Sequence, residues 1–128
     1  MTLCTSSFLT NYLPILFFLL YIFKGSYLYV TDFQINAVFK FNIELTEKET
    51  IIATGILNRP QGLAIDTAGN LLVCDSRNNC IRVSDTNGKI LCTIDTTGRE
   101  DLLMPLDVAI LKGGKVAVLD DYGRFRIF

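Results

Sequence analysis

The chain has 128 residues, of which half are hydrophobic and a fifth are charged, and its formal net charge is −1. This composition excludes a disordered chain, and the balanced charge disfavours a generic binder of polyanions. The sequence contains no histidine, which removes Ser-His and Cys-His nucleophile pairs and zinc sites built on histidine. We therefore expect one domain without a catalytic constellation, a bound metal or another cofactor.

The N-terminal segment, residues 1–25, differs from the rest of the chain. Residues 1–23 carry no charge, and an apolar run covers residues 8–23. The run is short for a membrane span of about 20 residues and lacks the basic start and the cleavage site of a signal peptide. Three interpretations stay open: a targeting or membrane segment, an aberrant start, or a native strand or helix. We expect a cytoplasmic protein, with a membrane or secreted location as the alternative if this segment is a genuine signal or anchor.

The rest of the chain, residues 26–128, repeats itself, as repeat architectures do. A short apolar strand that ends in aspartate occurs three times, at spacings of 43 and 45 residues, and closes at Asp32, Asp75 and Asp120. A proline that opens an apolar run occurs twice, 45 residues apart. These prolines are Pro60 and Pro105.

One period reads as four strands. The middle period predicts strands over residues 62–66, 71–74, 80–84 and 89–94, separated by turn residues. Four strands in about 40–45 residues are typical of a propeller blade. The sequence therefore predicts an all-β fold, a partial β-propeller of about two and a half four-stranded blades. The first blade is expected to lack its inner strand, and helix is expected only within residues 8–23.

The repeated aspartates and prolines are interpreted as structural. A carboxylate after a strand can accept backbone N–H groups two or three residues on and so fix the following turn. We predict this for Asp32, Asp75 and Asp120. Pro60 and Pro105 pre-set the backbone where the inner strand of a blade begins.

The repeat pattern resembles the NHL repeat. The run of residues 58–83 carries the resemblance most fully, and residues 105–109, 116–120 and 124–128 carry it again. The Asn-His-Leu triplet that names the family reads Asn-Ala-Val from Asn36 and Asn-Cys-Ile from Asn79. Cys80 stands where the family usually has arginine, whereas Arg124 keeps it. The resemblance covers residues 26–128 and implies blades of a closed ring, commonly of about six.

The resemblance also implies a function. NHL propellers mostly act as recognition platforms, so we expect a non-catalytic module that binds a protein partner. The substrate-selecting part of a tripartite-motif (TRIM-NHL) ubiquitin ligase is the nearest match in kind, although the chain itself lacks a RING. An RNA-binding propeller surface and a membrane-anchored or secreted propeller are the alternatives.

The candidate binding residues lie in the loops that a propeller places on one face. They are Arg59, Arg77, Asn78, Asn79, Arg99, Tyr122 and Arg124. Acidic residues stand among them at Glu100, Asp101 and Asp121. These acids would repel a phosphate chain, which favours a protein partner over RNA.

Two further expectations concern cysteine and association. The spacing of the four cysteines excludes a C-x-x-C pair, so we expect buried, reduced thiols. They are Cys4, Cys74, Cys80 and Cys92. Because both ends of a partial propeller lack a neighbouring blade, we expect the isolated chain to expose apolar surface and to associate.

Overall fold

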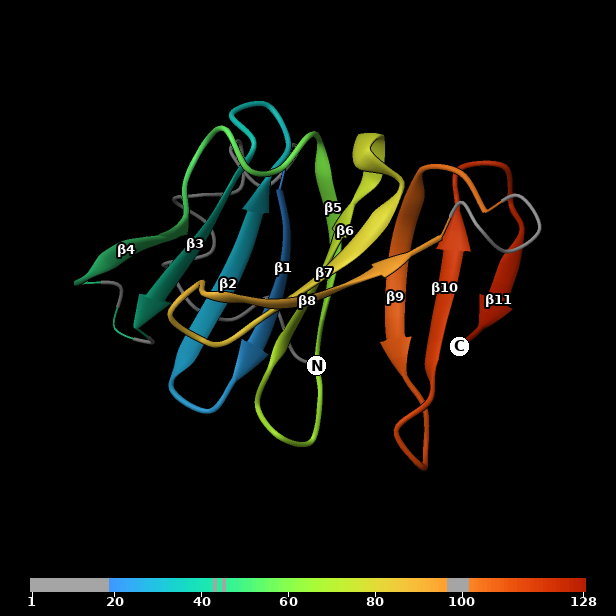
Figure 1. The fold of residues 1–128 in the computed structure, drawn as a ribbon. Helices are drawn as coiled ribbons and strands as arrows, with labels where there is room; N and C mark the ends of the chain where they lie inside the picture. Colours follow the sequence, from blue (N-terminus) through green and yellow to red (C-terminus); the bar gives the residue numbers. More distant parts are fainter. Residues whose placement is uncertain (1–18, 43, 45, 97–101) are drawn as a thin grey trace.

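The computed structural model describes residues 19–42, 44, 46–96 and 102–128. In these residues, eleven strands form three antiparallel sheets, and a single 3-10 turn, η1 (Ser76–Asn78), is the one helical element (Figure 1). The all-β fold class expected from the repeats is therefore confirmed. No helix in the described part of the chain is long and apolar enough to span a membrane.

Each sheet corresponds to one period of the sequence. The first sheet contains β1 (Leu19–Lys24), β2 (Tyr27–Asp32), β3 (Ala37–Asn42) and β4 (Lys48–Ile52), in that order. The middle sheet contains β5 (Pro60–Ile65), β6 (Leu71–Asp75), β7 (Cys80–Ser84) and β8 (Ile90–Asp95), again in chain order. The last sheet contains β9 (Pro105–Ile110), β10 (Val116–Asp120) and β11 (Phe125–Ile127).

Strand β1 corrects the expectation that the first blade lacks its inner strand. Every residue of β1 pairs with β2, from Leu19 opposite Asp32 to Lys24 opposite Tyr27. The first sheet thus begins inside the apolar N-terminal segment, and residues 19–24 form a strand rather than a helix. Residues 1–18, to which the membrane, targeting and aberrant-start interpretations also apply, lie outside the described residues.

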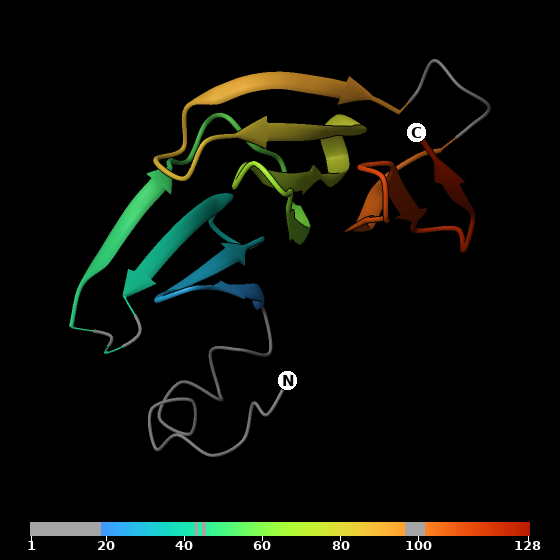
Figure 2. The same cartoon turned by 90° about the horizontal axis from the view of Figure 1, so that it is seen from below.

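The three sheets fan out side by side, with their inner strands as neighbours. β5 lies against β1 on one side and against β9 on the other, and Figure 2 shows the resulting arc with β8 on its outer rim. Side chains alternate across a strand, so β6 contributes side chains to the cores on both sides of the middle sheet. Leu71 and Val73 pack into the core shared with the first sheet, whereas Leu72 and Cys74 pack into the core shared with the last sheet.

Gly62 allows the middle and last sheets to approach closely. A Cβ atom at this position would lie 2.7 Å from the Cα atom of Asp107 on β9 and 2.5 Å from its Oδ1. No real side chain tolerates such contacts with backbone, so glycine is required where β5 meets β9.

Candidate partner-binding face

The loops that enter the inner strands and the loops that join the second and third strands lie along one edge of the molecule. This edge is at the top of Figure 1. We call it the upper face, and define it by the described residues of its loops. These are residues 33–36, 53–59, 76–79, 102–104 and 121–124.

Two asparagines connect each sheet to the next across the upper face. Asn36 Oδ1 accepts the backbone N–H of Arg59 at 2.7 Å. One period later, Asn79 Oδ1 accepts the backbone N–H of Met104 at 2.8 Å. All four residues have φ between 52° and 57°, a left-handed conformation that asparagine adopts more readily than most residues. Each accepted N–H precedes the proline that opens an inner strand, so the asparagine fixes the entry of the next sheet.

Two buried aspartates fix the same entry loops to the sheet that each loop enters. Asp75 Oδ1 accepts the backbone N–H of Asn58 at 2.8 Å. Asp120 Oδ2 accepts the backbone N–H of Leu103 at 3.4 Å. Asn58 and Leu103 occupy the same place, two residues before the proline of their strand. We call the two asparagine hydrogen bonds, which join each sheet to the entry of the next, the inter-sheet clamp.

The aspartates differ in how they hold their own turns. Asp32 Oδ1 accepts the N–H of Gln34 at 2.9 Å and that of Ile35 at 3.3 Å. Asp120 Oδ1 accepts the backbone N–H groups of Tyr122 and Arg124.

At Asp75, bonds from side chains replace the expected bonds from its own loop backbone. Asn78 Nδ2 donates to Oδ2 at 2.9 Å, and Arg82 Nε donates to the same oxygen at 2.9 Å. The 3-10 turn over Ser76–Asn78 explains the difference, because it brings the Asn78 amide, instead of a loop N–H, onto the carboxylate.

Cys80 stands where an arginine was expected to pair with the aspartate, and Arg82, two residues further along the same strand, forms the ion pair instead. In the last sheet, Arg124 donates through Nε to Asp120 Oδ2 at 2.8 Å. In the middle sheet, Cys80 stands opposite Asp75 in the register, and Arg82 reaches back along the same face to form the ion pair. The sequence could have predicted this substitution, because residues two apart on a strand lie on the same face, as positions 80 and 82 do.

Burial and hydrogen bonding set the protonation states around these carboxylates. Burial would raise the pKa of Asp120, but the N–H groups of Arg124, Tyr122 and Leu103 and the Arg124 guanidinium together lower it. The carboxylate is therefore an anion at neutral pH. Burial is also the largest cause that raises the pKa of Cys80 to about 11, so its thiol stays neutral beside Asp75.

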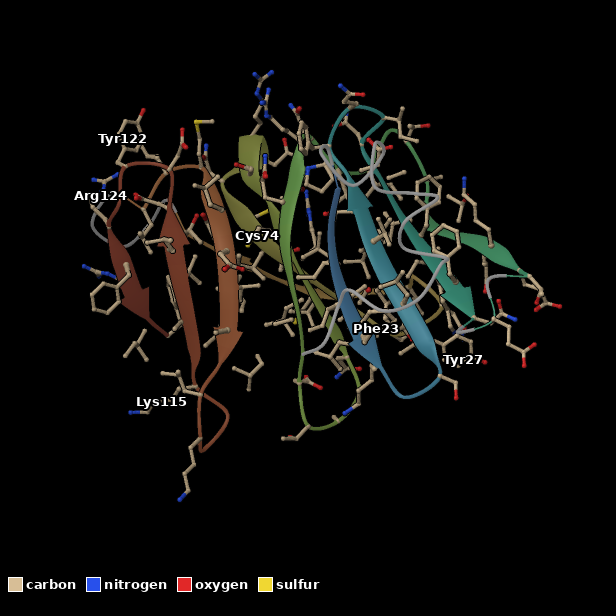
Figure 3. All side chains as sticks on the ribbon, turned by 180° about the vertical axis from the view of Figure 1, so that it is seen from behind. Phe23, Tyr27, Cys74, Lys115, Tyr122 and Arg124 are labelled. Carbon is tan, nitrogen blue, oxygen red and sulfur yellow. The ribbon has the colours of Figure 1, made fainter. Side chains whose placement is uncertain are left out.

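The structure places six of the seven candidate binding residues on the upper face, and Arg99 lies outside the described residues. Arg59 is exposed, with its guanidinium carbon 5.2 Å from the centre of the Phe33 ring. Arg124 lies at the same distance from the ring of Tyr122, which is 66 % exposed. Figure 3 shows Tyr122 and Arg124 together at one end of this face, with Lys115 at the opposite edge of the molecule.

The remaining candidates are partly used within the protein. Arg77 is exposed, and its backbone N–H donates to the carbonyl oxygen of Asn58 at 3.0 Å. Asn78 is exposed but its amide donates to Asp75. Asn79 is half-buried, and its Oδ1 belongs to the inter-sheet clamp. We therefore assign Asn78 and Asn79 chiefly to the architecture of the face.

Sequence reasoning missed the apolar side chains of the upper face. Ile35 and Ile56 are each 47 % exposed, and Leu103 is 39 % exposed. All three lie in loops of this face. The sequence could have indicated these exposed side chains, because each is an aliphatic residue among turn residues, as at Gly55-Ile56.

The cysteines follow the expectation only in part. Cys74 and Cys80 are buried free thiols, but Cys92 is exposed. Cys92 lies on β8, the outer strand of its sheet, and no sheet of the described residues covers it. Cys4 lies outside the described residues. Among the residues that are described, no cluster of three or more His, Cys, Asp or Glu side chains is arranged to hold a metal ion.

Comparison with known proteins supports the repeat and the fold. Residues 57–83 match the NHL repeat. Virginiamycin B lyase from Staphylococcus aureus has a similar structure, with a TM-score of 0.63, 11 % identity, and 84 % of this chain and 39 % of the lyase covered. A catalytically inactive histidine-to-alanine variant of that lyase with quinupristin gives the same values. A protein of unknown function from Bacteroides caccae matches with a TM-score of 0.51, 19 % identity, and coverage of 80 % and 41 %.

These likenesses define the fold and no more than the fold, because the identities are low. The matched region spans about two-fifths of those solved chains. No curated protein matches the sequence. The architecture is that of partial propeller blades, four, four and three strands in size. Its middle sheet carries an NHL repeat, which covers β5, β6 and nearly all of β7.

Proposed function

We propose that the chain is a non-catalytic recognition module that binds a protein partner through the upper face. The observation that carries the proposal is the combination of exposed apolar side chains, an exposed tyrosine and arginines on loops that the inter-sheet clamp holds. Tyrosine and arginine are enriched among residues that dominate binding energy. Loops already fixed in one conformation lose less entropy on binding than free loops do.

The charges of the upper face favour a protein over RNA. Arg124 is paired with the buried carboxylate of Asp120, which leaves Arg59 and Arg77 as the unpaired cations among its described loop residues. Two cations give little affinity for a phosphate backbone, whose binding depends on many such contacts. Ile35 and Ile56 offer a phosphate chain nothing, whereas they suit the apolar centre of a protein interface.

Neither a lyase activity nor a role in a TRIM-type ubiquitin ligase has support of its own. The lyase likeness shows the fold only, and this chain has no histidine, the residue type replaced in the inactive lyase variant. Selection of substrates for a TRIM-type ubiquitin ligase remains a hypothesis within the proposal, because the comparisons above give no TRIM relative. This hypothesis predicts that a TRIM-type ligase containing these blades ubiquitinates the bound partner.

A capture experiment with matched variants tests the proposal. The full chain is immobilised, exposed to an extract with and without ribonuclease, and compared with an Ile56→Ser/Tyr122→Ala variant. Lys115→Ala, on the opposite edge, is the control variant. We expect one protein that the wild type and the control retain and the upper-face variant loses, irrespective of ribonuclease. Equal retention by all three chains, or retention that ribonuclease abolishes, would contradict the proposal.

A further inference from the structure

Two exposed arginines of the upper face lie on loops that are bonded to each other. The backbone N–H of Arg77 donates to the carbonyl oxygen of Asn58 at 3.0 Å. Asn58 directly precedes Arg59, and both arginines are exposed. The two side chains therefore start from neighbouring points of the backbone, where the first sheet meets the middle sheet. We call Arg59 and Arg77 the arginine pair.

The fold itself does not require arginine at either position. One period after Arg59, Met104 has the same left-handed backbone and donates the equivalent clamp bond. Two residues after the repeated aspartate, the middle sheet has Arg77, the first sheet has Gln34 and the last has Tyr122. Other repeats thus form the same loops without a guanidinium group, which leaves the side chains of the pair free for another role.

Neither member of the pair has a carboxylate partner within the described part of the chain. The ion pairs there join Arg82 to Asp75 and Arg124 to Asp120. Asp121 is the one carboxylate among the described loop residues of the upper face, and it lies in the loop of the last sheet. The arginine pair therefore presents two positive charges that the described residues do not neutralise.

The ring of Phe33 orients the guanidinium group of Arg59. The guanidinium carbon lies 5.2 Å from the ring centre, within the range of a cation–π contact. A guanidinium group that stacks on a ring keeps its N–H edge free to form two parallel hydrogen bonds to a carboxylate. The backbone N–H of Arg59 is held as well, by Asn36 at 2.7 Å. A donor that is already held loses less entropy on binding than a mobile one.

Two exposed aliphatic side chains belong to the same joined loops. Ile56 lies three residues before Arg59, and Ile35 is next to Asn36, whose side chain bonds to Arg59. Each isoleucine is 47 % exposed. Their loops and the 3-10 turn that carries Arg77 lie along the upper edge in Figure 1. Apolar surface beside arginine is typical of a protein interface.

We propose that the arginine pair binds an acidic peptide segment of the partner. Carboxylate side chains of the segment meet the two guanidinium groups, and a neighbouring apolar side chain packs against Ile35 and Ile56. This inference rests on the proposed function, because it names the chemistry that the upper face recognises. Charge complementarity selects the acidic segment, and the planar fork of arginine matches a carboxylate in shape as well as in charge.

A peptide array probed with the full chain tests this inference. Each short sequence is synthesised in an acidic form and in an amide form, with asparagine and glutamine in place of aspartate and glutamate. We expect the wild type to retain acidic sequences that carry a neighbouring apolar residue, and to bind their amide forms about tenfold or more weakly. This comparison uses the wild-type chain alone, so it does not depend on how a variant folds.

Variants assign the effect to the arginine pair. Arg59→Gln and Arg77→Gln should each weaken binding of the acidic form by about tenfold and leave the amide form unchanged. Arg59→Lys keeps the charge but loses the planar fork, so its affinity should fall between those of the wild type and Arg59→Gln. Lys115→Gln removes a positive charge at the opposite edge of the molecule (Figure 3) and is the matched control.

Four outcomes would overturn the inference. Equal retention of acidic and amide forms, with both lost in Ile56→Ser/Tyr122→Ala, would leave the proposed function standing and show that the acidic chemistry is wrong. Retention of no sequence at all would also refute the inference, and the capture experiment then decides the proposed function separately. An equal loss in Lys115→Gln would show that overall charge, not the arginine pair, is responsible. Tighter binding of oligouridylate than of any acidic peptide, lost in both glutamine variants of the pair, would assign the pair to RNA.

Discussion

Replacing Asp75 by alanine should destabilise the protein more than any other single change at the upper face. Its carboxylate is fully buried and accepts hydrogen bonds from Asn58 N–H, Asn78 Nδ2 and Arg82 Nε at 2.8 to 2.9 Å. Breaking a buried ion pair by removing one partner costs about 3–5 kcal/mol. The Arg82 side chain is 27 % exposed, so water partly replaces its lost partner. We therefore expect a loss near the lower limit, about 3 kcal/mol.

Urea denaturation at one protein concentration measures this loss. With a slope of about 1–3 kcal/mol per molar, a loss of about 3 kcal/mol moves the midpoint by about 1 M or more. Asp75→Asn keeps an oxygen for Asn58 but removes the charge, so it should fall between the wild type and Asp75→Ala. A double-mutant cycle with Arg82→Ala isolates the ion pair. If Asp75→Ala costs less than about 1 kcal/mol, the carboxylate makes only an ordinary hydrogen bond and does not fix the entry of β5.

Three other changes probe separate parts of the structure. Gly62→Ala should lower stability by about 1–3 kcal/mol, because its Cβ would overlap the backbone of Asp107; an unchanged thermal midpoint would show that the sheets can separate freely. The pKa of Asp120 is lowered in the fold. The ionised carboxylate therefore stabilises the protein above the unfolded pKa of about 3.9, and this stabilisation is lost as pH falls through the folded pKa. The urea midpoints of the wild type and Asp120→Asn should converge on acidification, and a difference that stays constant with pH would refute this. Cys92 is exposed and Cys74 buried, so peptide mapping after alkylation of the folded chain should find the label on Cys92 and not on Cys74, and equal labelling would contradict the burial.

The repeats made the sheets predictable, but not the first strand. A turn residue every few positions and alternating strands located β5 to β8 closely. β1 was missed because residues 19–23 are apolar without interruption. A continuous apolar run suits a buried strand, a helix and a membrane segment alike. Only the pairing of Leu19–Lys24 with β2 distinguishes these.

The upper face was predictable in place but not in chemistry. The loops were located from propeller geometry, and the spacing of 43 residues between Asn36 and Asn79 was visible. The partners of these asparagines were not, because each hydrogen bond joins loops of two different sheets, 23 or 25 residues apart. Likewise, Arg82 replaces a missing arginine from another position on its strand, which a column-by-column reading of repeats cannot detect.

Hydrogen exchange at the backbone amides of Arg59 and Met104 tests the central claim most directly, namely that the inter-sheet clamp fixes the upper face. Both amides lie in loops, yet each donates to an asparagine of the preceding sheet. We predict protection comparable to that of strand amides, with Asn79→Ala accelerating Met104 alone and Asn36→Ala accelerating Arg59 alone. Exchange of both wild-type amides at the rate of an open loop, while the strand amides stay protected, would contradict the account.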